Sequence, residues 1–228
     1  LCPETTPLLS SKDGVWRVVG GFKEVSPRAP FLGARFAQAE GQVTVSGAPA
    51  GIGLTATVAD ARIVDALDPK RFEPLTAKGQ ATLAREVWNG AFDLGGTGPA
   101  AGAALGRMTL THDGRTGAGG VEIDVPGVTF AEHGLQPWML SPLVDDFVKS
   151  PAVGEVRFAG RFDWTKDAEP TSSGRLTVPG LDFVSPAGPV KGLKGDIELT
   201  SLTPLITAPN QNLTVDSLEV GAKATALD

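Results

Sequence analysis

The sequence contains almost none of the residues that build catalytic or metal centres. It has one cysteine, Cys2, so no internal disulfide can form. Its two histidines, His112 and His133, lie in polar segments next to glycine, which is typical of solvated turns. A zinc site needs three or four converging ligands, and nucleophilic serines of hydrolases often lie in a Gly-X-Ser-X-Gly elbow, which is missing here. We therefore expect no catalytic residue, no metal and no cofactor, and a protein that is not an enzyme.

Long hydrophobic runs and basic clusters are missing as well. No apolar run approaches the ~18 residues of a membrane-spanning helix. The net charge is −6 and the basic residues are scattered, which argues against nucleic acid as a partner. The chain begins without methionine and without a basic segment followed by an apolar stretch. We expect residues 1–228 to be one segment of a longer protein, whose other parts make any membrane contact.

Only one stretch predicts a helix. Ser141 can cap it, Pro142 suits its first turn, and a short apolar stripe follows before Pro151. Asp145-Asp146 would then form its solvated face rather than a cation site. This short helix, near 142–150, is expected to plug or brace the space beside the strands. Long amphipathic helices are absent, so no helical layer can cover a sheet.

Alternation of apolar and polar residues is the main signal that is present. It occurs in 42–46, in 52–58 and most clearly in 156–164. Because neighbouring side chains of a strand point to opposite faces, this pattern predicts strands with one apolar and one polar face. In the clearest strand the apolar face carries valine, phenylalanine and tryptophan, and the other carries arginine and aspartate. Glycine and proline clusters separate the runs, as turns do.

One hairpin unit occurs twice. The segment Gly106-Arg-Met-Thr-Leu-Thr-His-Asp113 resembles Gly160-Arg-Phe-Asp-Trp-Thr-Lys-Asp167, and 123–130 resembles 176–183. The repeated modules therefore span 106–130 and 160–183. Each second strand contains a Val-Pro-Gly break, and proline cannot donate to a ladder, so each break marks an edge, a bulge or a bend. Repeats of this kind favour an elongated array.

These patterns predict a mostly β fold. Each strand has an apolar face, and no helix is available to cover it. Two architectures satisfy this condition. The first is an elongated, strongly curved antiparallel sheet that forms an apolar groove, with the one short helix. The alternative is a closed β-sandwich, in which two sheets cover each other.

Residues 192–221 resemble the signature of a known family. A strand that ends near Ser-Leu-X-Pro-Leu is followed by Thr-X-Pro-X-Gln, a further strand and glycine. The matching residues are Ser201, Leu202, Pro204, Leu205, Thr207, Pro209, Gln211, Leu213, Val215 and Gly221. In these positions the chain is similar to the YdbH family, relatives of TamB and other AsmA-like proteins. The domain is sometimes labelled "dicarboxylate transport", but a dicarboxylate carrier needs membrane spans and converging cations, which the sequence lacks.

The resemblance implies a function. Members are held in the inner membrane of bacteria with two membranes, cross the periplasm as a folded sheet called a β-taco, and carry phospholipid between the two membranes. It implies a bridge that shields acyl chains and works in outer-membrane biogenesis. Phospholipid is then the main partner, and a small envelope protein that adds a strand at an exposed edge is a second. The alternative is a non-enzymatic β-sandwich interaction module of the cell envelope.

The apolar faces of the strands supply the expected lining of such a groove. Phe158 and Phe162 are its central aromatic residues. The full set is Val156, Phe158, Phe162, Trp164, Leu176, Val178, Leu181, Phe183, Ile197, Leu199, Leu213 and Val215.

Overall fold

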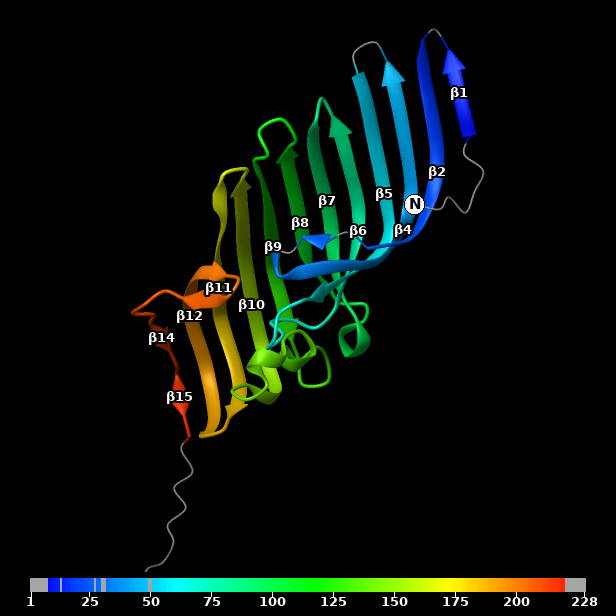
Figure 1. Ribbon diagram of the computed structural model, residues 1–228. Coiled ribbons are helices and arrows are strands. Elements are labelled where there is room, and N and C mark those ends of the chain that lie inside the picture. The colour runs from blue at the N-terminus through cyan, green and yellow to red at the C-terminus, as the bar shows by residue number, and fades with distance from the viewer. Residues whose placement is uncertain (1–7, 13, 27, 30–31, 49–50, 220–228) are drawn as a thin grey trace, which may run out of the picture.

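The described part of the chain forms one antiparallel sheet. The computed structural model describes residues 8–12, 14–26, 28–29, 32–48 and 51–219. Within them, fifteen strands join one sheet whose order follows the chain from β1 to β13, while β3 pairs with β4, and β14 and β15 pair with β12 (Figure 1). The strands are β1 Leu8–Lys12, β2 Val15–Val25, β3 Arg28–Ala29, β4 Ala34–Ala48, β5 Gly51–Asp65, β6 Leu75–Ala84, β7 Val87–Gly96, β8 Ala104–Asp113, β9 Gly119–Phe130, β10 Lys149–Thr165, β11 Ala168–Ser185, β12 Gly188–Leu202, β13 Leu205–Thr207, β14 Leu213–Thr214 and β15 Ser217–Leu218.

Bulges interrupt the strands at the Val-Pro-Gly breaks. In β9, Val125–Val128 spans the distance that β10 covers with Val156–Phe158. In β11, Val178–Leu181 faces only the shorter segment 193–195 of β12. A bulge leaves one residue unpaired and bends its strand. The two breaks therefore mark bends at equivalent points of the two hairpins, β8–β9 and β10–β11.

Register shifts at similar positions along the strands also occur among the N-terminal strands of the sheet. They interrupt the pairing of β2 with β4, of β4 with β5 and of β5 with β6. The distance along a strand from its hairpin turn to the first register shift is the same in β2 and in β10. Six positions separate Trp16 from Phe22, the last residue before the shift in β2, and six separate Trp164 from Phe158 in β10. At about 3.3 Å per residue this height is about 20 Å. We call the apolar face between the hairpin turns and this bulge line the upper panel.

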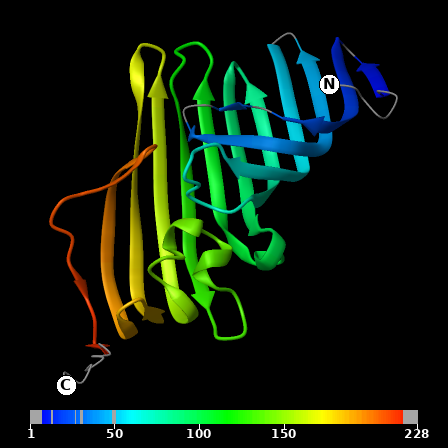
Figure 2. The same cartoon turned by 60° about the horizontal axis from the view of Figure 1, so that its bottom comes forward.

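Beyond the bulge line, the strands and connections fold over the apolar face. Figures 1 and 2 both show the lower part of β4 crossing the strands in the middle of the sheet. The connections 66–74 and 131–148 lie on the same side, and Phe72, Leu135 and Leu140 pack against the buried core. The core thus lies between the lower strands and the segments that cross them, and on β9 and β10 it also reaches Val121 and Phe162 near the hairpin turns.

This architecture confirms the predicted curved antiparallel sheet. It is a single open sheet, so the alternative of a closed two-sheet sandwich is wrong. No described helix is long and apolar enough to cross a membrane.

The predicted helix near 142–150 is also wrong. The described residues contain helical structure only of the 3-10 type: η2 Gly98–Ala100, η3 Pro137–Met139, η4 Pro142–Val144 and the single residue Leu32. After η4 the chain makes one further turn, and Lys149 already pairs with Val184 in the sheet. A helix this short gains too few hydrogen bonds to offset nucleation, and pairing of β10 takes its last residues.

Candidate functional site

The predicted groove-lining residues occupy two different environments. Ten of them pack in or against one apolar cluster that spans β8 to β12 and the lower strands: Val156, Phe158, Phe162, Trp164, Leu176, Val178, Leu181, Phe183, Ile197 and Leu199. Within this set Phe162 is only 6% exposed and Val178 only 5%. The remaining two, Leu213 and Val215, lie in or beside β14 at the sheet edge and are largely exposed.

The signature residues form the C-terminal border of the sheet. Ser201 and Leu202 end β12, the chain reverses at Pro204, and β13 contains Leu205 and Thr207. Exposed Pro209 precedes Gln211 in the return segment. Gly221 lies outside the described residues.

Gln211 fastens this return segment to β12. Its Oε1 accepts a hydrogen bond from the backbone N–H of Glu198 at 3.2 Å, and its Nε2 donates to the carbonyl of Ala208 at 2.9 Å. The signature therefore corresponds to a structural border in the described chain.

The exposed portion of the apolar face lies in the first half of the chain. In the upper panel of β2, β4, β5, β6 and β8, apolar side chains share one face because they are direct cross-strand partners or lie two positions apart in one strand. Most are only partly buried, and Ile52 is 63% exposed. The partly buried members are Val18, Val43, Val45, Leu54, Ala56, Leu83 and Leu110. A contiguous apolar surface left open to solvent is typical of a binding face.

On the apolar face, two tryptophan rings lie over glycines of neighbouring strands. A Cβ placed on Gly47 would lie 2.2 Å from the ring of Trp16, its direct cross-strand partner. A Cβ on Gly119 would lie 2.5 Å from the ring of Trp164, again its direct partner. The missing side chains let each ring cover the adjacent strand. The apolar surface therefore continues from one strand to the next at these two positions.

A buried ion pair ties the end of β5 to the end of β12. The Asp65 side chain, at the end of β5, is fully buried, and the Arg71 side chain is 11% exposed. Arg71 Nε and Nη2 donate to the two Asp65 carboxylate oxygens at 3.0 and 2.9 Å. Its Nη1 donates to the carbonyl of Leu202 at 2.6 Å and to Thr203 Oγ1 at 3.0 Å, and its Nη2 also donates to the carbonyl of Gly33 at 2.9 Å. We call this group the clasp.

The clasp shows how strongly the sheet is bent. The strands β5 and β12 are seven positions apart in the strand order, which is about 34 Å in a flat sheet. One guanidinium nevertheless contacts the last residues of both strands. Burial raises the pKa of the Asp65 carboxyl, but hydrogen bonds from Arg71 and from the backbone of Leu67 outweigh burial and hold this pKa below its ordinary value. The clasp is therefore ionised at neutral pH.

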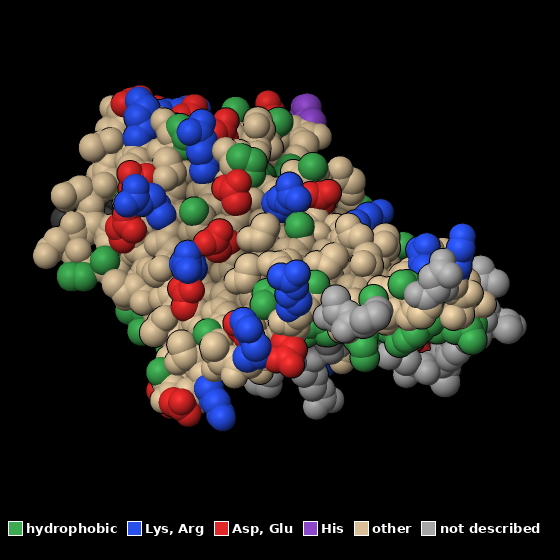
Figure 3. All heavy atoms as spheres, turned by 90° about the horizontal axis from the view of Figure 1, so that it is seen from above, with side chains coloured by type: hydrophobic (Ala, Val, Ile, Leu, Met, Phe, Trp, Pro, Cys, Tyr) green, Lys and Arg blue, Asp and Glu red, His purple; other side chains and the backbone are tan. Residues whose placement is uncertain are grey.

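The opposite face is covered with ion pairs. Figure 3 shows a face on which basic and acidic side chains lie beside one another, with few hydrophobic groups between them. On β9 to β12, Arg161 bonds to Glu122 and Asp163, and Arg175 bonds to Glu198. The hydrogen bonds that Arg161 donates to the Asp163 carboxylate raise the pKa of Arg161.

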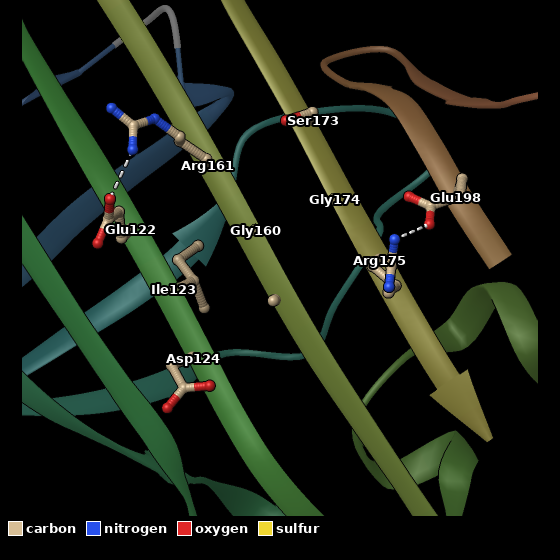
Figure 4. A pocket seen from close by; sticks show the side chains of 10 residues that line it. Glu122, Ile123, Asp124, Gly160, Arg161, Ser173, Gly174, Arg175 and Glu198 are labelled. Atoms are coloured by element: carbon tan, nitrogen blue, oxygen red, sulfur yellow. Dashed lines mark hydrogen bonds and ion pairs between the residues drawn. The ribbon is translucent and has the colours of Figure 1, made fainter. Parts of the chain in front are cut away.

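A shallow depression of about 400 Å³ lies among these pairs (Figure 4). Its arginines point toward neighbouring carboxylates rather than into an enclosed space. Exposed pairs of this kind contribute little to stability and keep this face hydrated.

The two histidines differ from each other. His133 is exposed in a turn, as predicted. For His112 the prediction of a solvated turn is wrong, because it lies partly buried in β8 and its Nδ1 accepts a hydrogen bond from Trp164 Nε1 at 3.2 Å. Among the described residues no group of three or more potential ligands could hold a metal ion.

A bent, open sheet with one apolar and one ion-paired face defines a class, the taco-like β proteins, which offer a surface rather than an enclosed pocket. A family model described as intermembrane phospholipid transport protein YdbH matches residues 3–228. The chain therefore belongs to the YdbH-like family, whose members transport phospholipid between membranes. Membership of this family implies lipid as the cargo and the periplasmic envelope as the location. No curated protein and no solved structure matches the chain.

The sequence analysis did not identify the exposed part of the upper panel or the clasp. The alternation in 42–46 and 52–58 was the available signal for the panel, since it predicts apolar faces on β4 and β5. Nothing local signals Arg71, whose partner Leu202 is 131 positions away.

Proposed function

We propose that the chain is a segment of a periplasm-spanning bridge that shields phospholipid acyl chains during transport between the inner and outer membranes. The protein that contains it would be anchored in the inner membrane of a bacterium with two membranes. The single observation that carries this proposal is the partly exposed apolar face of the upper panel, opposite an ion-paired face. Removing acyl chains from water is worth about 0.8 kcal/mol per CH₂, and it needs no directional chemistry.

In this proposal the two environments of the apolar face have different roles. The cluster around Phe158 and Phe162 forms the wall that holds the sheet bent, together with the other lining residues in β10 to β12. The exposed part of the upper panel, with Leu54 and Leu83, contacts the acyl chains. Leu213 and Val215 at the sheet edge would contact lipid only where a further strand extends the face.

Such a further strand is part of the proposal. The short strands β13, β14 and β15 pair with only a few residues of β12, and β1 forms the other end of the strand order. Exposed strand edges accept strands from other chains. We propose that a small envelope protein pairs at one of these edges.

The experiment compares two charges on opposite faces of β5. Leu54→Glu places a carboxylate on the open panel, and Thr57→Glu, three positions further and exposed on the other face, is the matched control. We expect both variants to fold by circular dichroism. Native mass spectrometry after expression should show phospholipid bound to the unaltered chain and to Thr57→Glu, and a loss of that lipid in Leu54→Glu.

Two results would contradict the proposal. One is the absence of phospholipid from the unaltered chain in both native spectra and organic extracts. The other is equal lipid occupancy in Leu54→Glu, in Ile52→Glu and in the control. Phe162→Glu is unsuited to this test, because its side chain is buried and an unpaired charge there should unfold the protein.

A further inference from the structure

Three of the four tryptophans of the chain lie along one margin of the sheet. Trp16 is the second residue of β2, Trp88 the second of β7, and Trp164 the last but one of β10. All three are therefore next to the hairpin turns that form the upper margin in Figure 1. The fourth, Trp138, lies in η3 of the connection 131–148, which covers the lower part of the sheet.

The three tryptophans also share a face. Trp88 is the direct partner of His112, His112 of Gly119, and Gly119 of Trp164, so one row crosses β7 to β10. The row continues through Leu83, Leu54 and Val45 to Val18 in β2, two positions from Trp16. Direct cross-strand partners present their side chains on one face. The tryptophans therefore lie at the hairpin margin of the upper panel, and all three are partly buried.

Indole is suited to a boundary between an apolar surface and water. It joins a large apolar ring to one N–H donor, and tryptophan is enriched where one end of a side chain is dry and the other wet. At this margin the rings of Trp16 and Trp164 lie over Gly47 and Gly119, so they extend the apolar face to its border without forming a raised wall.

One side-chain hydrogen bond lies at the same border. The N–H of Trp164 donates to Nδ1 of His112. With that nitrogen as acceptor, a neutral imidazole carries its own hydrogen on Nε2 and can donate from there.

The opposite margin of the panel has a different construction. There the connections 66–74 and 131–148 cross the face, and Phe72 and Leu140 pack on the core. A hydrated head group would meet packed apolar side chains at the bulge line, which is unfavourable. From β2 to β8 the hairpin margin borders apolar side chains that are only partly buried, whereas beside Trp164 the face is covered, since Phe162 is 6% exposed.

The height of the panel fits one leaflet of hydrocarbon. Six positions from the tryptophan margin to the bulge line correspond to about 20 Å. The hydrocarbon core of a bilayer is about 30 Å thick, so the acyl chains of a single lipid layer need about 15 Å. Chains that start at the margin can thus lie along the strands and end before the bulge line.

We infer that the margin formed by Trp16, Trp88 and Trp164, with His112, binds the glycerol-ester and head-group region of a phospholipid whose acyl chains point toward the bulge line. This inference rests on the proposed function and adds the orientation of the lipid. All head groups along the described segment would then lie at the hairpin margin, and none at the bulge line.

The experiment measures how deep each tryptophan lies along a bound lipid. Four single-tryptophan variants, with the other three changed to phenylalanine, are incubated with phosphatidylethanolamine vesicles and re-isolated. The vesicle lipid carries quenching bromines either near the ester end or near the methyl end of its acyl chains. Mass spectrometry of the same samples measures bound lipid. Trp138 is the matched control on the opposite margin.

We expect bound lipid, with greater loss of fluorescence from ester-end than from methyl-end bromines at Trp16, Trp88 and Trp164. Trp138 should show little quenching or the reverse order. Bound lipid with stronger methyl-end quenching at the margin, or with the same order at Trp138, would overturn the orientation and leave the proposed function standing. Absence of bound lipid would overturn both.

A second measurement avoids substitutions, in case a variant does not fold. The unaltered chain is labelled with 5-fluorotryptophan and loaded with lipid that carries a nitroxide on its head group. Fluorine NMR should show three broadened resonances and one sharp one. Broadening of the Trp138 resonance alone would overturn the inference.

Discussion

Removal of the arginine from the clasp should destabilise the protein far more than removal of an arginine from the ion-paired face. In Arg71→Met the carboxylate of Asp65 stays fully buried without its partner, and the carbonyls of Leu202 and Gly33 lose a charged donor. Breaking a buried pair by removing one partner costs about 3–5 kcal/mol. The matched control is Arg161→Met, because this arginine is 57% exposed and exposed pairs contribute about 0–1 kcal/mol.

The assay is urea denaturation at neutral pH, followed by tryptophan fluorescence, with the free energy of unfolding as the measured quantity. A double variant completes the cycle. Asp65→Asn combined with Arg71→Met removes the buried charge, so it should be more stable than Arg71→Met alone. The reasoning is refuted if Arg71→Met costs no more than Arg161→Met, or if the two clasp substitutions are additive.

Three further predictions follow from single contacts. Gly119→Ala should cost about 1–3 kcal/mol, because its Cβ would lie 2.5 Å from the Trp164 ring, whereas Gly180→Ala meets nothing within 4 Å and should be neutral in the same thermal melt. The lowered pKa of Asp65 gives stability that is present above its unfolded value of about 3.8 and is lost as pH falls toward its folded value. Asp65→Asn should therefore flatten the acid limb of an unfolding titration, and an unchanged limb would contradict this. Gln211→Ala should cost about 1 kcal/mol and speed amide exchange in β13 and β14, while unchanged exchange would argue against its fastening role.

The periodic part of the fold could be predicted from the sequence. Alternation in 156–164 correctly indicated which side chains face the core, because the geometry of a strand fixes this locally. The Val-Pro-Gly breaks indicated the bulges of β9 and β11, since proline cannot donate to the ladder. Both signals depend only on neighbouring residues.

The degree of exposure of each part of the apolar face could not be predicted. Alternation assigns Phe162 and Leu54 to apolar faces alike, but only Phe162 is buried. The difference arises from the segments 66–74 and 131–148, which follow no period and pack across distant strands. The clasp has the same origin, since Arg71 and Leu202 meet only once the whole sheet is bent.

The line of bulges also has a consequence for the length of the sheet, measured across its strands. Most of the strands carry their own bend, and neighbouring strands are joined by hairpins, so a duplicated hairpin brings both its bend and its two faces with it. Insertion of one such unit would lengthen the sheet by two strand spacings, about 10 Å, and leave its cross-section unchanged. The length of a protein built in this way is proportional to its number of hairpins. Gene duplication can therefore change that length in steps of fixed size until it matches the distance between the two membranes.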